Sequence, residues 1–185
     1  MQKTVVSIKN PTHEGTGFNV SPDGLIITNY HVVKDAPSVT ITFYDGKMFS
    51  AKEWTPLPEI DIALIKINGK DLPTIQLEED GLVSAGDTVT IIGNPLGFQR
   101  VITRGKITSL SSVEEIDSPV LTIEGTIYQG SSGSPVTNEN NKVIGVIFAT
   151  LRNDDIENKD NIIGLAIPAS QIVKHIKKVL ENSST

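Results

Sequence analysis

The sequence contains no cysteine, so disulfide frameworks, thiolate nucleophiles and cysteine–zinc sites are all excluded. Any nucleophile must therefore carry oxygen or nitrogen. No window approaches the ~18 consecutive apolar residues that a membrane-spanning helix needs. Basic residues are outnumbered, and the formal net charge of −6 argues against nucleic acid or an anionic membrane as a partner.

The first ten residues, MQKTVVSIKN, also lack the apolar core of a signal peptide. The sequence leaves the location open, and with no export signal in the sequence as given, a cytoplasmic protein is one interpretation. The alternative is an extracytoplasmic location, if this chain is one domain of a longer, anchored protein.

What the sequence does contain is a series of short apolar or alternating runs. Its 185 residues, 38% hydrophobic and 21% charged, are typical of one soluble domain, or of one domain made of two similar halves. Asp23-Gly24 and Asp45-Gly46 are strong hairpin signals, and residues 138–141 form a third expected turn. Short strands at this spacing predict an all-β barrel or sandwich. The runs are TVVSI (4–8), GLIITN (24–29), VTITF (39–43), DIALIKI (61–67), DTVTIIG (87–93), VLTIEG (120–125), KVIGVIFA (142–149) and IIGLAI (162–167).

Two segments differ from this pattern. Residues 169–182, ASQIVKHIKKVLEN, place their apolar side chains on one stripe opposite lysines, which predicts an amphipathic helix docked on the domain. Residues 68–86 contain turn residues and little periodicity, and we interpret them as a bridge between two β halves. The predicted organisation is an N-terminal half (about 1–78), a C-terminal half (79–168) and a C-terminal helix (169–182).

The stretch YQGSSGSPV, residues 128–136, places three serines among glycines and a proline. A serine hydroxyl becomes a good nucleophile only with a base in hydrogen-bond reach, and the oxyanion that forms needs preorganised donors. In the well-studied serine triad, the backbone N–H groups of the serine and of a glycine two residues earlier bind that oxyanion. Only Ser132 has such a glycine, Gly130. Taken alone, the cluster is more typical of a solvated turn.

Three histidines are candidates for the base. His13 lies in the polar turn PTHEG and His175 lies among lysines on the predicted helix, so we expect both on the surface. His31 ends the apolar strand GLIITNY, where an imidazole is well placed to face a cleft. A satisfied core histidine is the competing interpretation of His31.

Asp61 opens the apolar run DIALIKI. A buried carboxylate is costly unless it is paired, and an aspartate that accepts from an imidazole N–H fixes the tautomer of the ring. A turn or strand-capping aspartate is the alternative. The chain offers one residue of each required type, in the order His31, Asp61, Ser132, and this combination favours a serine triad.

That order and the sequence motifs around the three residues resemble the chymotrypsin-fold serine proteases, and among them the bacterial HtrA/Deg branch. GTGFNVSPDGLIITNYHVV (15–33) looks like the glycine-rich hairpin that leads to the catalytic histidine. DIALIKI is similar to the aspartate strand, and GSSGSPV to the serine motif. IIGNPLGFQRVITRGKITSL (91–110) looks like the first hairpin of the second barrel, while KVIGVIFAT and IIGLAIP resemble the strands that wall the substrate pocket. The resemblance covers nearly the whole chain.

The resemblance implies two perpendicular six-stranded antiparallel β-barrels with the site between them, followed by a C-terminal α-helix. It implies that Ser132 attacks the scissile carbonyl, His31 moves the proton and Asp61 holds His31. The N–H groups of Gly130 and Ser132 would bind the oxyanion. Protein or peptide substrates and no cofactor follow from the same resemblance. A homo-oligomer is one expectation for the assembly, because relatives of this kind often form trimers.

Two positions depart from the family pattern. The family usually has Asn or Asp where this chain has Ser131, and in secreted digestive relatives that Asp pairs with a freed N-terminal amine. We therefore expect no activation of that kind. Ser134 stands where glycine is usual, a small change that is compatible with activity. We also expect no C-terminal PDZ domain, because the predicted helix ends near Asn182.

The alignment of motifs also predicts a substrate pocket. It places Thr126 at the pocket base with Ile127 beside it, and Phe148, Ala149 and Thr150 along one wall. No acidic residue lies at the base, so we expect cleavage after small aliphatic residues rather than after Lys or Arg.

The acidic run LRNDDIENKDN, residues 151–161, offers Asp154, Asp155, Glu157 and Asp160 as Ca²⁺ ligands. The glycine and the terminal glutamate of an EF-hand loop are missing, so we expect a solvated loop beside the pocket and no metal.

The main alternative to an active serine endopeptidase is a catalytically weak or inactive protease-like scaffold. Such a protein would bind extended or unfolded polypeptides by strand addition. An inactive relative normally loses a triad residue, and here all three residue types are present, which favours the enzyme.

Overall fold

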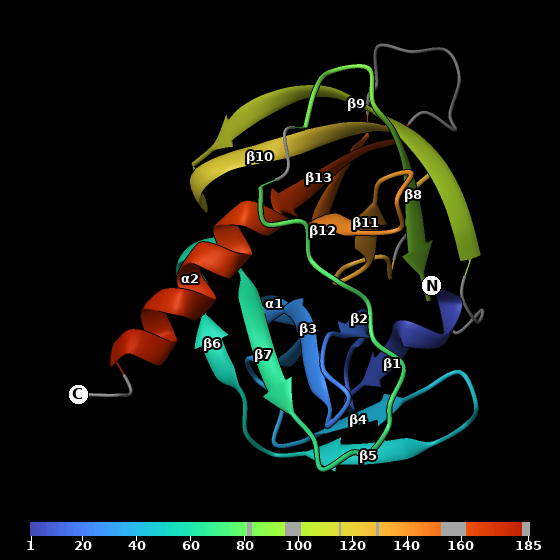
Figure 1. Cartoon of the computed structure of the whole chain (residues 1–185), viewed down its shortest axis with the longest axis vertical. Coiled ribbons are helices and arrows are strands. Elements are labelled where there is room, and N and C mark those ends of the chain that lie inside the picture. Colours follow the sequence, from blue (N-terminus) through green and yellow to red (C-terminus); the bar gives the residue numbers. More distant parts are fainter. Residues whose placement is uncertain (81–82, 95–100, 115, 129, 153–161, 183–185) are drawn as a thin grey trace.

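The computed structural model describes residues 1–80, 83–94, 101–114, 116–128, 130–152 and 162–182. Two β structures lie one above the other, and a C-terminal helix, α2 (Ala169–Asn182), extends along one side of both (Figure 1). The strands of residues 5–66 form the first structure and those of residues 88–168 form the second.

The first structure is a seven-stranded antiparallel sheet in the order β5-β4-β1-β2-β3-β7-β6. Both Asp-Gly turns predicted from the sequence are present, with φ of 91° at Gly24 and 84° at Gly46, values that glycine adopts at little cost. The elements are η1 (Gln2–Thr4), β1 (Val5–Lys9), β2 (Glu14–Asn19), β3 (Leu25–Asn29), α1 (Tyr30–Val33), β4 (Val39–Thr42), β5 (Met48–Ala51), β6 (Thr55–Leu57), η2 (Pro58–Ile60) and β7 (Ile62–Lys66), where η marks a 3₁₀ turn.

The second structure is a closed six-stranded barrel in the order β10-β13-β12-β11-β8-β9. Register shifts interrupt its ladders between β9 and β10 and between β12 and β13, and such irregularities bend the strands of a barrel. The strands are β8 (Thr88–Gly93), β9 (Val101–Val113), β10 (Ile116–Gly125), β11 (Pro135–Thr137), β12 (Val143–Arg152) and β13 (Ile162–Pro168).

This architecture confirms the all-β, chymotrypsin-like fold with a C-terminal helix. The first half differs in one detail from two six-stranded barrels, because its seven strands are hydrogen-bonded in an open order. The boundary expected near residue 78 lies in the connection between the two structures, and the division into two halves and a helix stays our interpretation.

Three clusters of buried apolar side chains hold the fold together. One fills the first sheet around Ile41 and Ile65, and another fills the barrel around Ile123 and Val136. The third contains residues from both structures and Ile172 of α2. Each fully buried side chain of this size contributes about 1.5–3 kcal/mol, so this shared cluster is what docks the two halves.

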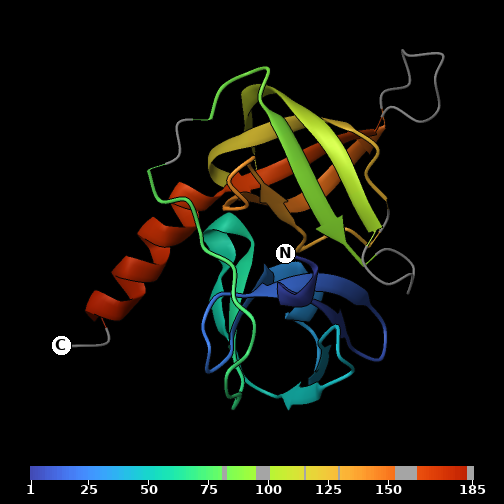
Figure 2. The same ribbon diagram turned by 45° about the vertical axis from the view of Figure 1, so that its right-hand side comes forward.

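The connection between the two structures is itself paired to the barrel. Leu77 forms a parallel bridge with Val143, whose N–H donates to Gln76 O and whose carbonyl accepts from the Glu78 N–H, both at 2.8 Å. We call residues 76–78 the linker strap. Residues 67–80, the part of the connection that contains the strap, run across the face of the molecule in Figure 2.

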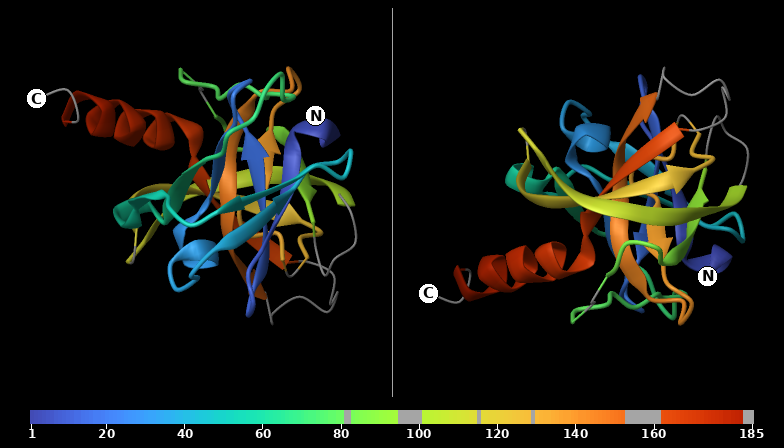
Figure 3. Two further views of the ribbon diagram at one scale, coloured as in Figure 1. Left: turned by 90° about the horizontal axis from the view of Figure 1, so that it is seen from below. Right: turned by 90° about the horizontal axis from the view of Figure 1, so that it is seen from above.

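Helix α2 has the bounds predicted from the sequence, and its apolar stripe packs on the domain as expected. Ile172 is fully buried, and Ile176 and Val179 pack half-buried against the shared cluster. Viewed from below and from above, the helix projects beyond the strands at its C-terminal end (Figure 3). Lys177 on its outer side forms a 2.9 Å ion pair with Glu79, and the hydrogen bond to that carboxylate raises the pKa of Lys177.

Candidate active site

His31 lies in a one-turn helix rather than at a strand end. Strand β3 ends at Asn29, and α1 covers Tyr30–Val33. The two valines of this turn are buried, and Asn10 Nδ2 donates to the Val32 carbonyl at 2.9 Å. These contacts fix the turn, while the His31 side chain stays 41% exposed.

Asp61 follows the 3₁₀ turn η2 and adopts a left-handed conformation, with φ 50° and ψ 41°. Such a conformation costs a non-glycine residue about 1–3 kcal/mol, although Asp and Asn tolerate it best. Two donors hold the Asp61 carbonyl in place, the Tyr30 N–H and Asn29 Nδ2, each at 3.0 Å. The strained backbone is thus anchored to the turn that carries His31.

The side chains of these two residues form a close pair. His31 Nδ1 lies 2.6 Å from Asp61 Oδ2, and the His31 backbone N–H donates to Asp61 Oδ1 at 2.9 Å. An ionised carboxylate only accepts hydrogen bonds, so Nδ1 carries the proton. In the neutral tautomer that has its proton on Nδ1, the other ring nitrogen, Nε2, is the acceptor.

The three serines differ in exposure. Ser131 is 4% exposed and Ser134 is fully buried, whereas Ser132 is partly exposed. We call residues 130–134 the serine loop, which precedes β11. Ser132 is therefore the one serine of this loop that is not buried.

Most backbone groups of the serine loop are held by hydrogen bonds. Ser131 N–H donates to Tyr128 O at 3.1 Å, Ser134 N–H to Ser131 O at 2.9 Å, and Gly133 N–H to Ile147 O at 2.8 Å. Within the described residues, the N–H groups of Gly130 and Ser132 have no acceptor. These are the two N–H groups that the family resemblance predicts as oxyanion donors.

Strand β2 lies between the serine loop and the histidine turn. Thr16 N–H donates to Ser132 O at 2.8 Å. A Cβ placed on Gly15 would lie 2.8 Å from Val32 Cγ1 and 3.4 Å from Ser132 O, so Gly15 contacts both segments. In the described part of the chain, no hydrogen bond joins Ser132 Oγ to His31, and catalytic hydrogen bonds often tighten only when substrate binds.

Gly133 gives the first testable prediction. Its φ is 84°, and a Cβ there would lie 1.8 Å from the Thr16 carbonyl oxygen, a backbone atom that cannot move away cheaply. We expect Gly133→Ala to lower the melting temperature by at least about 10 °C, because strain and a backbone clash add.

Gly46 provides the matched control, because it has the same φ of 84° but nothing within 4 Å of an added Cβ. Gly46→Ala should therefore show only the backbone strain, a drop of about 2–6 °C. Thermal unfolding followed by circular dichroism measures both. Equal melting temperatures for the two variants would show that the clash is absent.

The five residues predicted to form the substrate pocket differ in how deeply they are buried. Ile127 is 1% exposed and belongs to the barrel interior, where Gly164 leaves room for its side chain. Phe148 and Ala149 are half-buried on β12, and Thr126 and Thr150 are exposed.

The other two histidines lie apart from this arrangement. His13 is exposed in its turn, next to the Thr12 hydroxyl. The expectation of a solvated His175 needs a correction, because its side chain is only 18% exposed, Nδ1 donates to Gln171 O, and Nε2 lies 3.8 Å from Glu59. The sequence pattern missed this contact, since Glu59 comes from a distant 3₁₀ turn.

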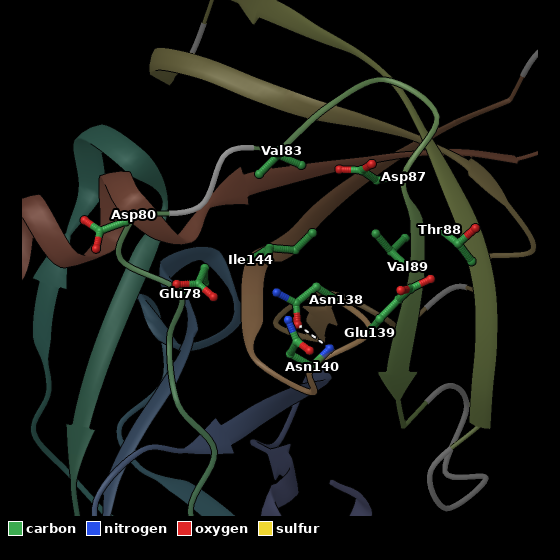
Figure 4. Close-up of a pocket in the computed structure, with 10 residues that line it drawn as sticks. All are labelled: Glu78, Asp80, Val83, Asp87, Thr88, Val89, Asn138, Glu139, Asn140 and Ile144. Atoms are coloured by element: carbon green, nitrogen blue, oxygen red, sulfur yellow. Dashed lines mark hydrogen bonds between the residues drawn. The ribbon is translucent and has the colours of Figure 1, made fainter.

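A hollow of about 470 Å³ lies between the connection and the barrel, and Figure 4 shows its lining. Glu78 on one side pairs with Lys142, and Asn138 on the other accepts from the Asn140 N–H at 3.0 Å to build the predicted turn. None of the candidate catalytic or pocket residues lines it.

The proposed Ca²⁺ ligands Asp154, Asp155, Glu157 and Asp160 lie outside the described residues. Within the described ranges, no three His, Cys, Asp or Glu side chains are grouped so that they could hold a metal ion. Among the same residues, no helix is both long and apolar enough to cross a membrane.

The fold, together with the His31–Asp61 pair and the serine loop, is typical of the trypsin-like peptidases. The model of the trypsin-like peptidase domain matches residues 15–146, and the chain belongs to that family. The HtrA-like resemblance seen in the sequence is confirmed by the proteins that the chain is similar to.

A probable periplasmic serine endoprotease DegP-like from Chlamydia trachomatis is 38% identical over 135 residues, which cover 71% of this chain and 27% of that protein. The chain thus spans between a quarter and a third of the length of the curated relatives that it matches.

Two solved structures agree with the fold. The HtrA-type protease AlgW with a decapeptide has a TM-score of 0.83 at 22% identity and covers 97% of this chain and 65% of its own. The Rv3671c protease of M. tuberculosis, in an inactive form, has a TM-score of 0.79 at 27% identity and covers 96% of this chain and 89% of its own.

Proposed function

We propose that this domain is a serine endopeptidase that hydrolyses peptide bonds of protein substrates through Ser132, His31 and Asp61. The observation that carries the proposal is the double hydrogen bond between Asp61 and His31, which in the neutral ring selects the tautomer with its proton on Nδ1 and so makes Nε2 the acceptor. Family membership and the two donors of the serine loop that have no acceptor among the described residues support it.

The reaction proposed for this site has two halves. Nε2 takes the Ser132 hydroxyl proton as Oγ bonds to the scissile carbonyl carbon, and the resulting oxyanion accepts from the N–H groups of Gly130 and Ser132. The imidazolium, stabilised by Asp61, then protonates the leaving amine as the C–N bond breaks. Water attacks the acyl-enzyme with the same base, releasing the acid and restoring Ser132.

Labelling by a fluorophosphonate probe tests the assignment directly. Such probes phosphonylate a serine only when a base activates it. We expect one label for each chain, mapped by peptide mass spectrometry to Ser132, together with cleavage of casein. Heat-denatured protein serves as the control and should not react.

A label on Ser131 or Ser134 would contradict the assignment of the nucleophile. An unlabelled protein that nevertheless binds unfolded casein would favour the inactive scaffold over the enzyme.

Substrate preference is a second prediction of the proposed function. The half-buried Phe148 and Ala149 offer a small apolar wall, and Thr126 and Thr150 bring no charge. A peptide library should therefore show cleavage after Val, Ala, Leu or Ile, with shallow discrimination, since one methylene is worth about 1–3 kcal/mol. A profile dominated by Arg or Lys would refute the assigned pocket.

Location and assembly remain proposals as well. Several relatives are named periplasmic, so of the two locations expected from the sequence we propose the extracytoplasmic one. A homo-oligomer stays a prediction from the family resemblance.

A further inference from the structure

We propose that Thr16 is a positioning residue for the oxyanion donors, an inference that rests on the proposed function. Thr16 lies on β2 in the N-terminal half, is fully buried, and bonds to two carbonyls of the serine loop in the C-terminal half. Its backbone N–H donates to Ser132 O at 2.8 Å, and its hydroxyl donates to Gly130 O at 3.2 Å.

The Thr16 hydroxyl is oriented by a third group. Oγ1 accepts from the Asn94 backbone N–H at 3.0 Å, so its own proton is directed elsewhere, towards Gly130 O. Asn94 is 5% exposed, and its Nδ2 bonds Glu14 at 3.2 Å. Both hydrogen-bonding roles of the hydroxyl are therefore used in a buried place, where an unpaired group costs about 1–3 kcal/mol.

These bonds matter because Gly130 has little conformational preference of its own. Its φ is 91°, and glycine reaches positive and negative φ at similar cost, so the residue does not by itself decide where its N–H points. The peptide between Gly130 and Ser131 is fixed on both sides, at its carbonyl by Thr16 and at its N–H by Tyr128 O. With that plane held, only rotation at Gly130 itself remains.

The carbonyl of Thr16 takes part in the same contact. It accepts from Thr28 Oγ1 at 2.7 Å, and it is the atom that an added Cβ on Gly133 would strike. The backbone of Thr16 thus packs directly on the serine loop, and its hydroxyl reaches the glycine that carries one of the two donors. Thr16 touches no reacting atom in this arrangement and acts through Gly130.

Thr16→Val removes the hydroxyl and keeps the branched shape. We expect kcat/KM for a peptide substrate to fall roughly 10–100-fold with KM within about 3-fold, since a donor displaced by about 1 Å costs on the order of 10². The affinity of a peptide aldehyde, whose hemiacetal places an oxyanion on these donors, should fall by the same factor. Thr16→Ser, which keeps the hydroxyl, should stay within about 3-fold of the parent.

Thr137→Val is the matched control. Thr137 is also fully buried, and its hydroxyl donates to a backbone carbonyl, Thr90 O, at 3.1 Å, but it bonds no atom of the serine loop. It should lose stability like Thr16→Val and keep its activity and its aldehyde affinity. Should Thr16→Val fail to fold, Thr16→Ala replaces it.

Equal kcat/KM for Thr16→Val and Thr137→Val in a protein whose parent labels at Ser132 would overturn this inference and leave the proposed function intact. If the parent proves inert, the amide of Ser131 still decides the matter. Hydrogen exchange by NMR should be faster at that amide in Thr16→Val than in Thr137→Val, and unchanged exchange refutes the positioning role.

Discussion

Ser132→Ala is expected to lower kcat by roughly 10⁶-fold while the melting temperature changes by no more than a few degrees. Loss of the nucleophile of an intact serine triad has an effect on this order, and the residual rate comes from binding and the oxyanion donors. The fold should survive, because Ser132 is partly exposed and contributes its carbonyl, rather than its hydroxyl, to the bond with Thr16.

Ser134→Ala is the matched control for this result. Ser134 is fully buried, and its Oγ has no hydrogen-bond partner among the residues that the structure describes. Removing an unsatisfied buried hydroxyl is neutral or stabilising, so turnover should stay within about 3-fold of the parent. Hydrolysis of a fluorogenic peptide measures both variants. A Ser132→Ala protein that retains more than about a hundredth of the parental rate would rule out Ser132 as the nucleophile.

Asp61→Asn is expected to lower kcat by about 10⁴-fold with little loss of stability. Asn adopts the left-handed backbone as readily as Asp, and its Oδ1 can still accept from the His31 N–H. Its amide nitrogen then faces Nδ1 and donates to it. The proton moves to Nε2, and the imidazole can no longer take the serine proton.

The pH–rate profile gives a further check on this prediction. Raising the pH should not restore Asp61→Asn, because the defect is a tautomer rather than a charge. Asp61→Ala, in contrast, should also lose stability, since it removes both bonds to His31 from a strained backbone. An Asp61→Asn protein with near-parental kcat would show that Asp61 does not orient His31.

The long apolar runs were predictable because their pattern reports burial directly. Val5, Ile26, Ile65 and Ile91 lie in strands found from the sequence, and each is fully or almost fully buried. The Asp-Gly turns follow from the same local chemistry. Strands β5, β6 and β11 have only three or four residues, so their partners rather than their own patterns define them.

The long-range contacts at the site could not be predicted from the sequence, for a different reason. Nothing in GTG marks Thr16 as a residue that bonds Gly130, because that contact joins positions 114 residues apart. The expected strand end at His31 is in fact a helical turn, which requires the Asn29 and Tyr30 bonds to Asp61. The sequence shows the types and the order of the three candidate catalytic residues. The hydrogen bonds that hold their backbone in place depend on tertiary structure, which the sequence does not show.

The linker strap has a consequence for how strong the contacts between the halves need to be. A tether that is already paired to the barrel makes docking intramolecular, at an effective concentration on the order of millimolar. The halves therefore meet often without a large affinity of their own. Bonds such as that of Thr16 to Gly130 can then be selected for geometry instead of strength, and active-site alignment becomes separable from overall stability.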